Sequence, residues 1–101
     1  MQSHHSPSEK RLFRAISLLK DEKECEAFFE DICTIKEIMD MAQRLDTACL
    51  LDEGLNYQTI SRKAGVSSTT ISRVARCLNY GSGGYKTVLS LLTEKENADE
   101  I

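Results

Sequence analysis

The sequence of 101 residues has little of what would direct it to a membrane or to an irregular fold. It contains a single proline, and no apolar run approaches the roughly 20 residues that a membrane-spanning helix needs. No secretory signal segment is recognisable at its beginning. Its length is that of one ordinary domain. We therefore expect a single, mostly helical domain that acts in the cytoplasm and makes no contact with a membrane.

Residues that hold metals or perform acid–base catalysis are scarce as well. The only histidines are His4 and His5, so the body of the chain lacks the commonest general base. The four cysteines are Cys25, Cys33, Cys49 and Cys77. They form no C-x-x-C pair and have apolar neighbours, which is typical of reduced thiols that lie mostly in a core. No catalytic Ser/His/Asp or Cys/His set is evident. The sequence thus predicts no metal site, no cofactor and no enzymatic activity.

Acidic residues are absent from one long stretch. Between Gly54 and Leu92 there is no Asp or Glu, but there are five bases: Arg62, Lys63, Arg73, Arg76 and Lys86. Residues 1–53 carry seven bases and twelve acids, and residues 93–101 carry one base and four acids. A basic segment on an acidic body is typical of a surface that binds phosphate. The acidic remainder disfavours loose binding by charge alone, so a fitted contact is expected.

The acid-free stretch has the pattern of a helix-turn-helix. Asn56 is a good N-terminal cap for a helix over Tyr57–Ala64, and Gly65 suits the left-handed residue that ends it. Ser67 would then cap a second helix that extends to about Leu78. The expected inward positions have the spacing of two helices that cross steeply, and they are Ile60, Ala64, Val66, Ile71 and Val74.

The outward face of this pattern indicates binding to double-stranded DNA. Short hydroxyl side chains allow a helix to enter the major groove, and Arg can bind guanine or phosphate. The candidate DNA-binding residues are Tyr57, Gln58, Arg62, Lys63, Ser67, Ser68, Thr69, Thr70, Ser72, Arg73 and Arg76. We expect Ser68, Thr69 and Ser72 near base edges, and Arg62 and Lys63 on phosphate. The alternative is a protein-interaction scaffold that uses the same face.

Capping signals divide the rest of the chain into further helices. Ser6-Pro7-Ser8-Glu9 predicts a helix to about Lys20, Asp21 predicts the next, and Thr34-Ile35-Lys36-Glu37 predicts a long helix to about Glu53. A last helix is expected over about 85–93, followed by a loose acidic tail over 94–101, and residues 1–5 are expected to be disordered. The predicted fold is therefore all-α with about six helices in one domain.

The apolar stripes of the N-terminal helices are more than a small monomer can bury. Phe13, Phe28 and Phe29 stand out, so residues 6–53 are expected to form the core of a homodimer. One helix-turn-helix reads only a few base pairs, and a two-fold dimer that spans two successive major grooves of a palindromic operator is the usual solution. The alternative is a monomer with some exposed apolar surface.

The segment Asp31–Leu78 resembles the tryptophan-repressor family. It has T-x9-R along the long helix, a Leu-Leu pair and a glycine at the end of that helix, and T-I-S-R in the second helix of the helix-turn-helix. The phrases FFEDICT, AQRL and SSTTISRVARCLNYG are most similar to the YerC/YecD branch of bacterial regulators. The resemblance implies an intertwined, all-helical TrpR-like dimer that represses transcription.

The same resemblance implies a pocket for a small-molecule corepressor. Its positions correspond here to Thr34, Arg44, Thr70, Arg73, Val74 and Cys77. The tryptophan-binding relatives have glycine where this chain has Val74 and serine where it has Cys77, and the connection over residues 54–57 is about one residue shorter. We therefore expect no binding of tryptophan and leave the identity of any effector open. The alternative role for Arg44 and Arg73 is structural support or phosphate contact.

Overall fold

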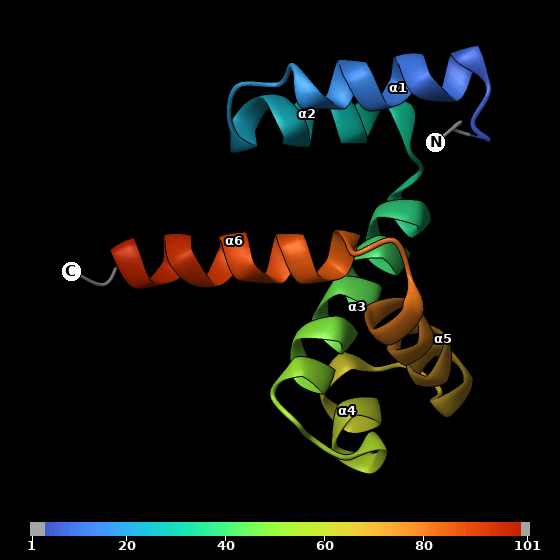
Figure 1. Cartoon of the computed structure of the whole chain (residues 1–101), viewed down its shortest axis with the longest axis vertical. Coiled ribbons are helices and arrows are strands. Elements are labelled where there is room, and N and C mark those ends of the chain that lie inside the picture. The colour runs from blue at the N-terminus through green and yellow to red at the C-terminus, as the bar shows by residue number, and fades with distance from the viewer. Residues whose placement is uncertain (1–3, 100–101) are drawn as a thin grey trace. The chain divides into compact units, whose positions relative to one another are not determined.

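The structure is a computed structural model that describes residues 4–99, and every element in that range is a helix (Figure 1). The helices are α1 (Pro7–Ser17), α2 (Glu22–Ile32), α3 (Ile35–Asp52), α4 (Tyr57–Ala64), α5 (Ser68–Tyr80) and α6 (Gly84–Asp99). The predicted all-α class is therefore confirmed. None of these helices is both long and apolar enough to cross a membrane.

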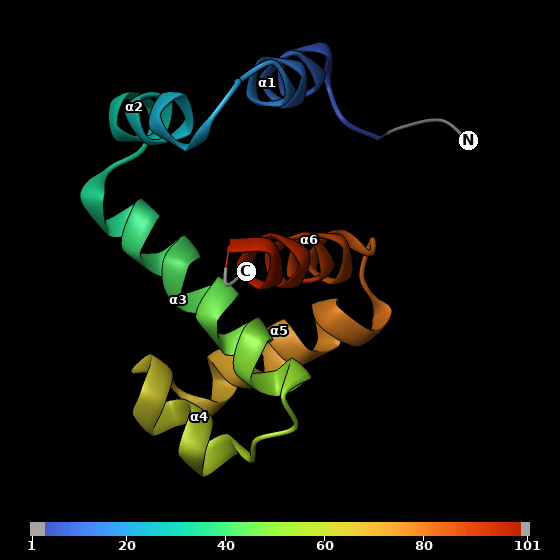
Figure 2. The ribbon, with the colours of Figure 1, turned by 90° about the vertical axis from the view of Figure 1, so that its left-hand side faces the viewer.

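The chain divides into two compact units. The first extends to Ile38 and contains α1, α2 and the first turn of α3, and the second begins at Met39 and contains the remaining helices. In the second unit α4 packs against α5, and α5 packs against α6, as both views of the ribbon show (Figure 1 and Figure 2). The helix-turn-helix and its support thus belong to one unit.

The predicted N-terminal caps are present in the structure. Ser6 Oγ accepts a hydrogen bond from the Glu9 backbone N–H at 3.1 Å. The Glu9 carboxylate in turn accepts one from the Ser6 backbone N–H at 2.9 Å, which completes a capping box. These hydrogen bonds lower the pKa of the Glu9 carboxyl below its ordinary value. Asp21 caps α2 at 2.9 Å and Asn56 caps α4 at 2.9 Å. Each cap satisfies a backbone donor that the first turn leaves without a partner.

The ends of α1, α5 and α6 differ from the sequence prediction. α1 ends at Ser17 rather than Lys20, because Leu18 and Leu19 turn back to bond the Ala15 and Ile16 carbonyls. α5 extends past Leu78 to Tyr80.

The prediction of a loose tail after Thr93 is wrong for residues 94–99, which continue α6. That segment has no helix breaker, and Lys95 pairs with Asp99 one turn later at 3.5 Å. The tail prediction for residues 100–101 and the disorder prediction for residues 1–3 lie outside the described residues.

The core lies in the second unit. Ala48 of α3, Val74 and Leu78 of α5 and Leu89 of α6 form one buried cluster. Ile60 and Ile71, the inward positions of the two short helices, are also fully buried. The prediction is therefore confirmed for Ile60, Ile71 and Val74. The other two predicted inward residues, Ala64 and Val66, are only half-buried.

The first unit has no comparable core. No residue of α1 or α2 is buried, although both helices are amphipathic. At the start of α3, Ile35 is 81% exposed, and beyond it Met39 is 57% exposed. Ile35 and Met39 have the spacing of one apolar helical face, yet that face is exposed within the single chain. These apolar stripes have no cover in the single chain.

The four cysteines are free thiols. Cys25, Cys33 and Cys49 are half-buried, and burial together with the nearby carboxylates of Asp46 and Glu53 raises the pKa of the Cys49 thiol. Cys77 is exposed, so the prediction of a core position is wrong for this residue.

Candidate nucleic-acid interface

The turn between α4 and α5 is held by its own backbone and by one hydroxyl. Gly65 has φ +69, a conformation that glycine adopts without steric cost, and its N–H donates to the Ser61 carbonyl at 3.0 Å. Ser61 Oγ donates to the Val66 carbonyl at 2.7 Å. The last turn of α4 and the entry to α5 are therefore connected directly, which fixes the direction in which α5 leaves the turn.

The first turn of α5 presents hydroxyl groups. Ser67 Oγ accepts from the Thr70 backbone N–H at 3.2 Å and donates to Thr70 Oγ1 at 3.2 Å. Ser68 and Thr69 are exposed, and Ser72 is exposed one turn further on. Because Ile71 and Val74 are buried on the opposite side of the helix, α5 has one face in the core and one polar face free for a ligand.

Cations border this polar face. Arg73 and Arg76 are exposed on α5, and Arg62 and Lys63 are exposed in the last turn of α4. No carboxylate of residues 4–99 pairs with these four side chains. Neither α4 nor α5 has an acidic residue in its first turn.

The N-terminal end of α4 adds two more exposed side chains, those of Tyr57 and Gln58. Every predicted DNA-binding residue except the half-buried Thr70 is therefore exposed on the helix-turn-helix.

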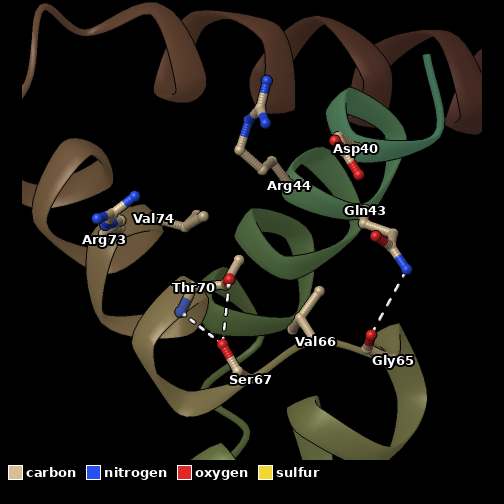
Figure 3. Close-up of a pocket in the computed structure, with 9 residues that line it drawn as sticks. All are labelled: Asp40, Gln43, Arg44, Gly65, Val66, Ser67, Thr70, Arg73 and Val74. Carbon is tan, nitrogen blue, oxygen red and sulfur yellow. Dashed lines mark hydrogen bonds between the residues drawn. The ribbon is translucent and has the colours of Figure 1, made fainter. Parts of the chain in front are cut away.

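A hollow of about 370 Å³ lies where α3 faces the turn and the start of α5 (Figure 3). Arg44 extends from α3 and Arg73 from α5, and Val74 points into the space between them (Figure 3). The complete lining is Asp40, Gln43, Arg44, Gly65, Val66, Ser67, Thr70, Arg73 and Val74. The hollow thus combines two guanidinium groups, a carboxylate and hydroxyls with two valine side chains.

Gln43 connects α3 to the turn across this hollow. Its Nε2 donates to the Gly65 carbonyl at 3.5 Å, a long hydrogen bond near an exposed surface (Figure 3). The backbone carbonyl of Gln43 accepts a hydrogen bond from Thr47 Oγ1 at 2.7 Å, and Thr47 is fully buried. The sequence reasoning missed Gln43 and Asp40. Asp40 precedes Arg44 by four residues, so helical spacing alone could have placed it beside Arg44.

The structure brings together only part of the pocket that the family resemblance implied. Arg44, Thr70, Arg73 and Val74 line the hollow. Thr34 belongs to the first unit, where its Oγ1 accepts from the Glu37 N–H at 3.1 Å and caps α3. The inclusion of Thr34 therefore has no support in the described contacts.

Cys77 lines a different hollow, of about 520 Å³, together with Leu45, Tyr85 and Val88. In the single chain Cys77 therefore does not line the hollow of Arg44 and Arg73, because it lies one turn beyond Arg73 and Val74, where α5 faces α6.

An all-α chain with an exposed, acid-free helix-turn-helix defines a DNA-binding regulator as the class of protein. Comparison with known proteins gives the family. The model of the family described as Trp repressor protein matches residues 8–93, and the chain therefore belongs to the Trp repressor family.

Relatives and solved structures agree with this membership. The chain is 50% identical over 86 residues to the uncharacterised protein YerC of Bacillus subtilis, covering 85% of this chain and 83% of YerC. A TrpR-like protein from Eubacterium eligens has 46% identity and a TM-score of 0.82, over 87% of this chain and 91% of the other. A candidate Trp repressor from Staphylococcus aureus has 38% identity and a TM-score of 0.83, over 88% and 89%. The fold and the predicted branch of the family are thus confirmed.

Proposed function

We propose that this member of the Trp repressor family is a sequence-specific repressor of transcription that binds a palindromic operator as a homodimer in the bacterial cytoplasm. The observation that carries the proposal is the free face of α5. This face presents exposed hydroxyl and guanidinium groups and no carboxylate. The opposite face of α5 is anchored in the core by the buried side chains of Ile71 and Val74.

The orientation of α5 gives each group a role. The residues just after the cap enter the major groove first, so Ser68, Thr69 and Ser72 would lie near base edges or sugars. Arg73 and Arg76 follow one turn later and can contact guanine or phosphate. Arg62 and Lys63 end the helix that crosses the backbone, so they would contact phosphate.

The apolar surface of the first unit supports a dimer. Both α1 and α2 are amphipathic, yet neither contains a buried residue. A helix with an apolar stripe gains stability when that stripe is covered, and a second copy of the chain could supply the cover.

The hollow beside α5 is proposed as a site for a small effector other than tryptophan. Val74 is 2% exposed and belongs to the buried cluster, so room for an aromatic ring would require displacement of core packing. Two guanidinium groups favour an anionic group in any ligand that binds there. A ligand would contact both α3 and the first turns of α5, and could therefore change how firmly the reading helix is held.

Selection of bound sites from random duplex DNA tests the proposal. Purified wild-type protein should recover palindromes whose half-sites are about one helical turn, roughly 10 base pairs, apart. An Arg73→Ala/Arg76→Ala variant, which keeps the buried face of α5, serves as the control and should recover no common sequence. Binding of all duplexes with equal affinity by the wild type would contradict sequence-specific regulation and favour a protein-interaction scaffold.

A further inference from the structure

The side chain of Gln43 lies against the turn of the helix-turn-helix from a third helix. Its Nε2 donates to the Gly65 carbonyl at 3.5 Å, and the two residues are 22 positions apart in the sequence (Figure 3). A Cβ at Gly65 would lie 3.7 Å from the same Nε2, which is ordinary van der Waals contact. The amide therefore packs on the turn as well as bonding to it. Both residues belong to the second unit, so the contact lies within one compact part of the chain.

The Gly65 carbonyl is a group that helix geometry leaves without a donor. The last carbonyls of a helix have no partner in a following turn, and Gly65 ends α4 in a left-handed conformation with φ +69. The next carbonyl along the chain, that of Val66, accepts a hydrogen bond from Ser61 Oγ at 2.7 Å. Two successive carbonyls of the turn are thus bound by side chains, one from α4 and one from α3. The bond from α3 connects the turn to a helix outside the helix-turn-helix.

Gln43 extends from a part of α3 that is fixed in the core. One helical turn later Thr47 is fully buried, and its Oγ1 bonds to the backbone carbonyl of Gln43. Ala48 is also fully buried, and it packs with Val74 and Leu78 of α5. Gln43 itself is half-buried. A donor on such a rigid support can hold its acceptor at a defined place.

The position of the turn affects where the first turn of α5 lies. Ser67 follows Gly65 by two residues and caps α5, and the exposed Ser68 and Thr69 come directly after it. The buried anchor Ile71 comes only after these hydroxyls. The end of α5 that is proposed to read bases is therefore held by the core on one side and by the turn on the other.

We propose that Gln43 is a positioning residue for DNA recognition, which holds the turn, and through it Ser68 and Thr69, in place without the help of a ligand. The proposal rests on the operator binding proposed above and adds a residue that acts through the turn. Because the donor is part of the chain, protein dialysed free of small molecules should already discriminate its operator from other duplexes. Loss of one long hydrogen bond should lower operator affinity about threefold per half-site, and roughly tenfold for a dimer on two half-sites.

Substitution of Gln43 by methionine tests the positioning role. Methionine has a similar length and no charge, but it has no N–H to donate. Gln43→Met should lower the ratio of operator affinity to scrambled-duplex affinity about tenfold, as measured by fluorescence anisotropy on the dialysed full chain. Gln43→Lys keeps a donor at a similar length and should restore most of this ratio. Its added charge strengthens binding to both duplexes alike and so cancels in the ratio.

Amide hydrogen exchange of the free protein separates this role from the proposed function. The amides of Gly65 and Thr70, which are hydrogen-bonded in the turn and in the cap of α5, should exchange about threefold faster in Gln43→Met and recover in Gln43→Lys. The Thr87 amide in α6 is the internal control and should exchange at an unchanged rate.

The outcomes of the two measurements are distinct. Unchanged exchange at Gly65 and Thr70, or an unchanged affinity ratio in Gln43→Met, would overturn the positioning role. An equal acceleration at Thr87 would overturn it too, because the variant would then loosen the whole unit. A wild type that binds both duplexes equally would contradict the proposed function, whereas faster exchange confined to the turn would still show that Gln43 holds it.

Discussion

At the scale of single residues, Lys63 and Thr69 are both exposed on the helix-turn-helix, but their loss should have different effects. Lys63→Ala should weaken binding to all duplexes alike and lower the salt dependence by about one counterion per half-site. Thr69→Ala should cost roughly 1–3 kcal/mol on the operator and relax the preference at one position of each half-site. Titrations on operator and scrambled duplex across a salt series measure both effects. Full discrimination by Thr69→Ala together with its loss in Lys63→Ala would show that the proposed orientation of α5 is wrong.

Val74 should exclude tryptophan from the hollow. The family resemblance implies a glycine at this position in a tryptophan-binding protein, and the burial of the Val74 side chain prevents it from moving aside. Isothermal titration of the wild type with tryptophan should therefore give no heat of binding at micromolar concentrations. A micromolar affinity that disappears in Arg44→Ala would mean that the hollow accepts the ring despite Val74.

Gly81 and Gly84 offer a matched pair for stability. A Cβ at Gly81 would lie 2.3 Å from the Cys77 carbonyl oxygen, whereas a Cβ at Gly84 would meet nothing within 4 Å. Gly81→Ala should therefore lower the free energy of unfolding by about 1–3 kcal/mol, as forced contacts in a packed region do. Gly84→Ala should change it little. Urea unfolding measures the two variants, and equal stability would show that the end of α5 can adjust without cost.

At the scale of the element, acidic substitutions in the first turn of α5 should leave the helix folded but abolish its binding to DNA. Ser68→Asp/Thr69→Asp places two carboxylates in the first turn, where the helix dipole favours them by about 0.3–1 kcal/mol each. The fold should therefore remain, while repulsion from phosphate abolishes operator binding. Ser8→Asp, in the exposed first turn of α1, is the control and should keep operator affinity. Circular dichroism and fluorescence anisotropy record both properties, and unchanged affinity in the α5 variant would remove α5 from the interface.

Helix starts were predictable from the sequence, but some helix ends were not. A start depends on a local device, as when Asn56 bonds the N–H of Thr59, and such devices are visible in a few residues. The end of α6 depends on the weak helix preference of an acidic segment and on ion pairs such as Lys95–Asp99. No glycine or proline in that segment marks where the helix ends. The same limit affects the hollow. Cys77 lies one helical turn after Arg73, but in the single chain it lines a second hollow with Tyr85 and Val88, which the spacing within α5 does not show.

At the scale of the whole molecule, assembly should depend on the first unit. Phe28 and Phe29 form an edge-to-face pair with ring centroids 5.8 Å apart and are only half-buried in the single chain. Phe28→Asp/Phe29→Asp should abolish both dimerisation and folding, since it places charge in the proposed shared core. Glu26→Gln/Glu30→Gln on the exposed face of the same helix should leave both intact. A wild-type chain that sediments as a stable, folded monomer at micromolar concentration would contradict this prediction.

The lack of buried residues in α1 and α2 also bears on how much of this regulator a cell can accumulate. In the proposed dimer, each newly synthesised chain completes its N-terminal half only when it meets another chain. Partner binding stabilises the folded state by mass action, so chains made at a low rate stay unpaired and open to proteases for longer. The amount of dimer should then rise more steeply than the rate of chain synthesis. A modest fall in translation would therefore lower the occupancy of the regulated promoters by a larger factor than the fall in translation itself.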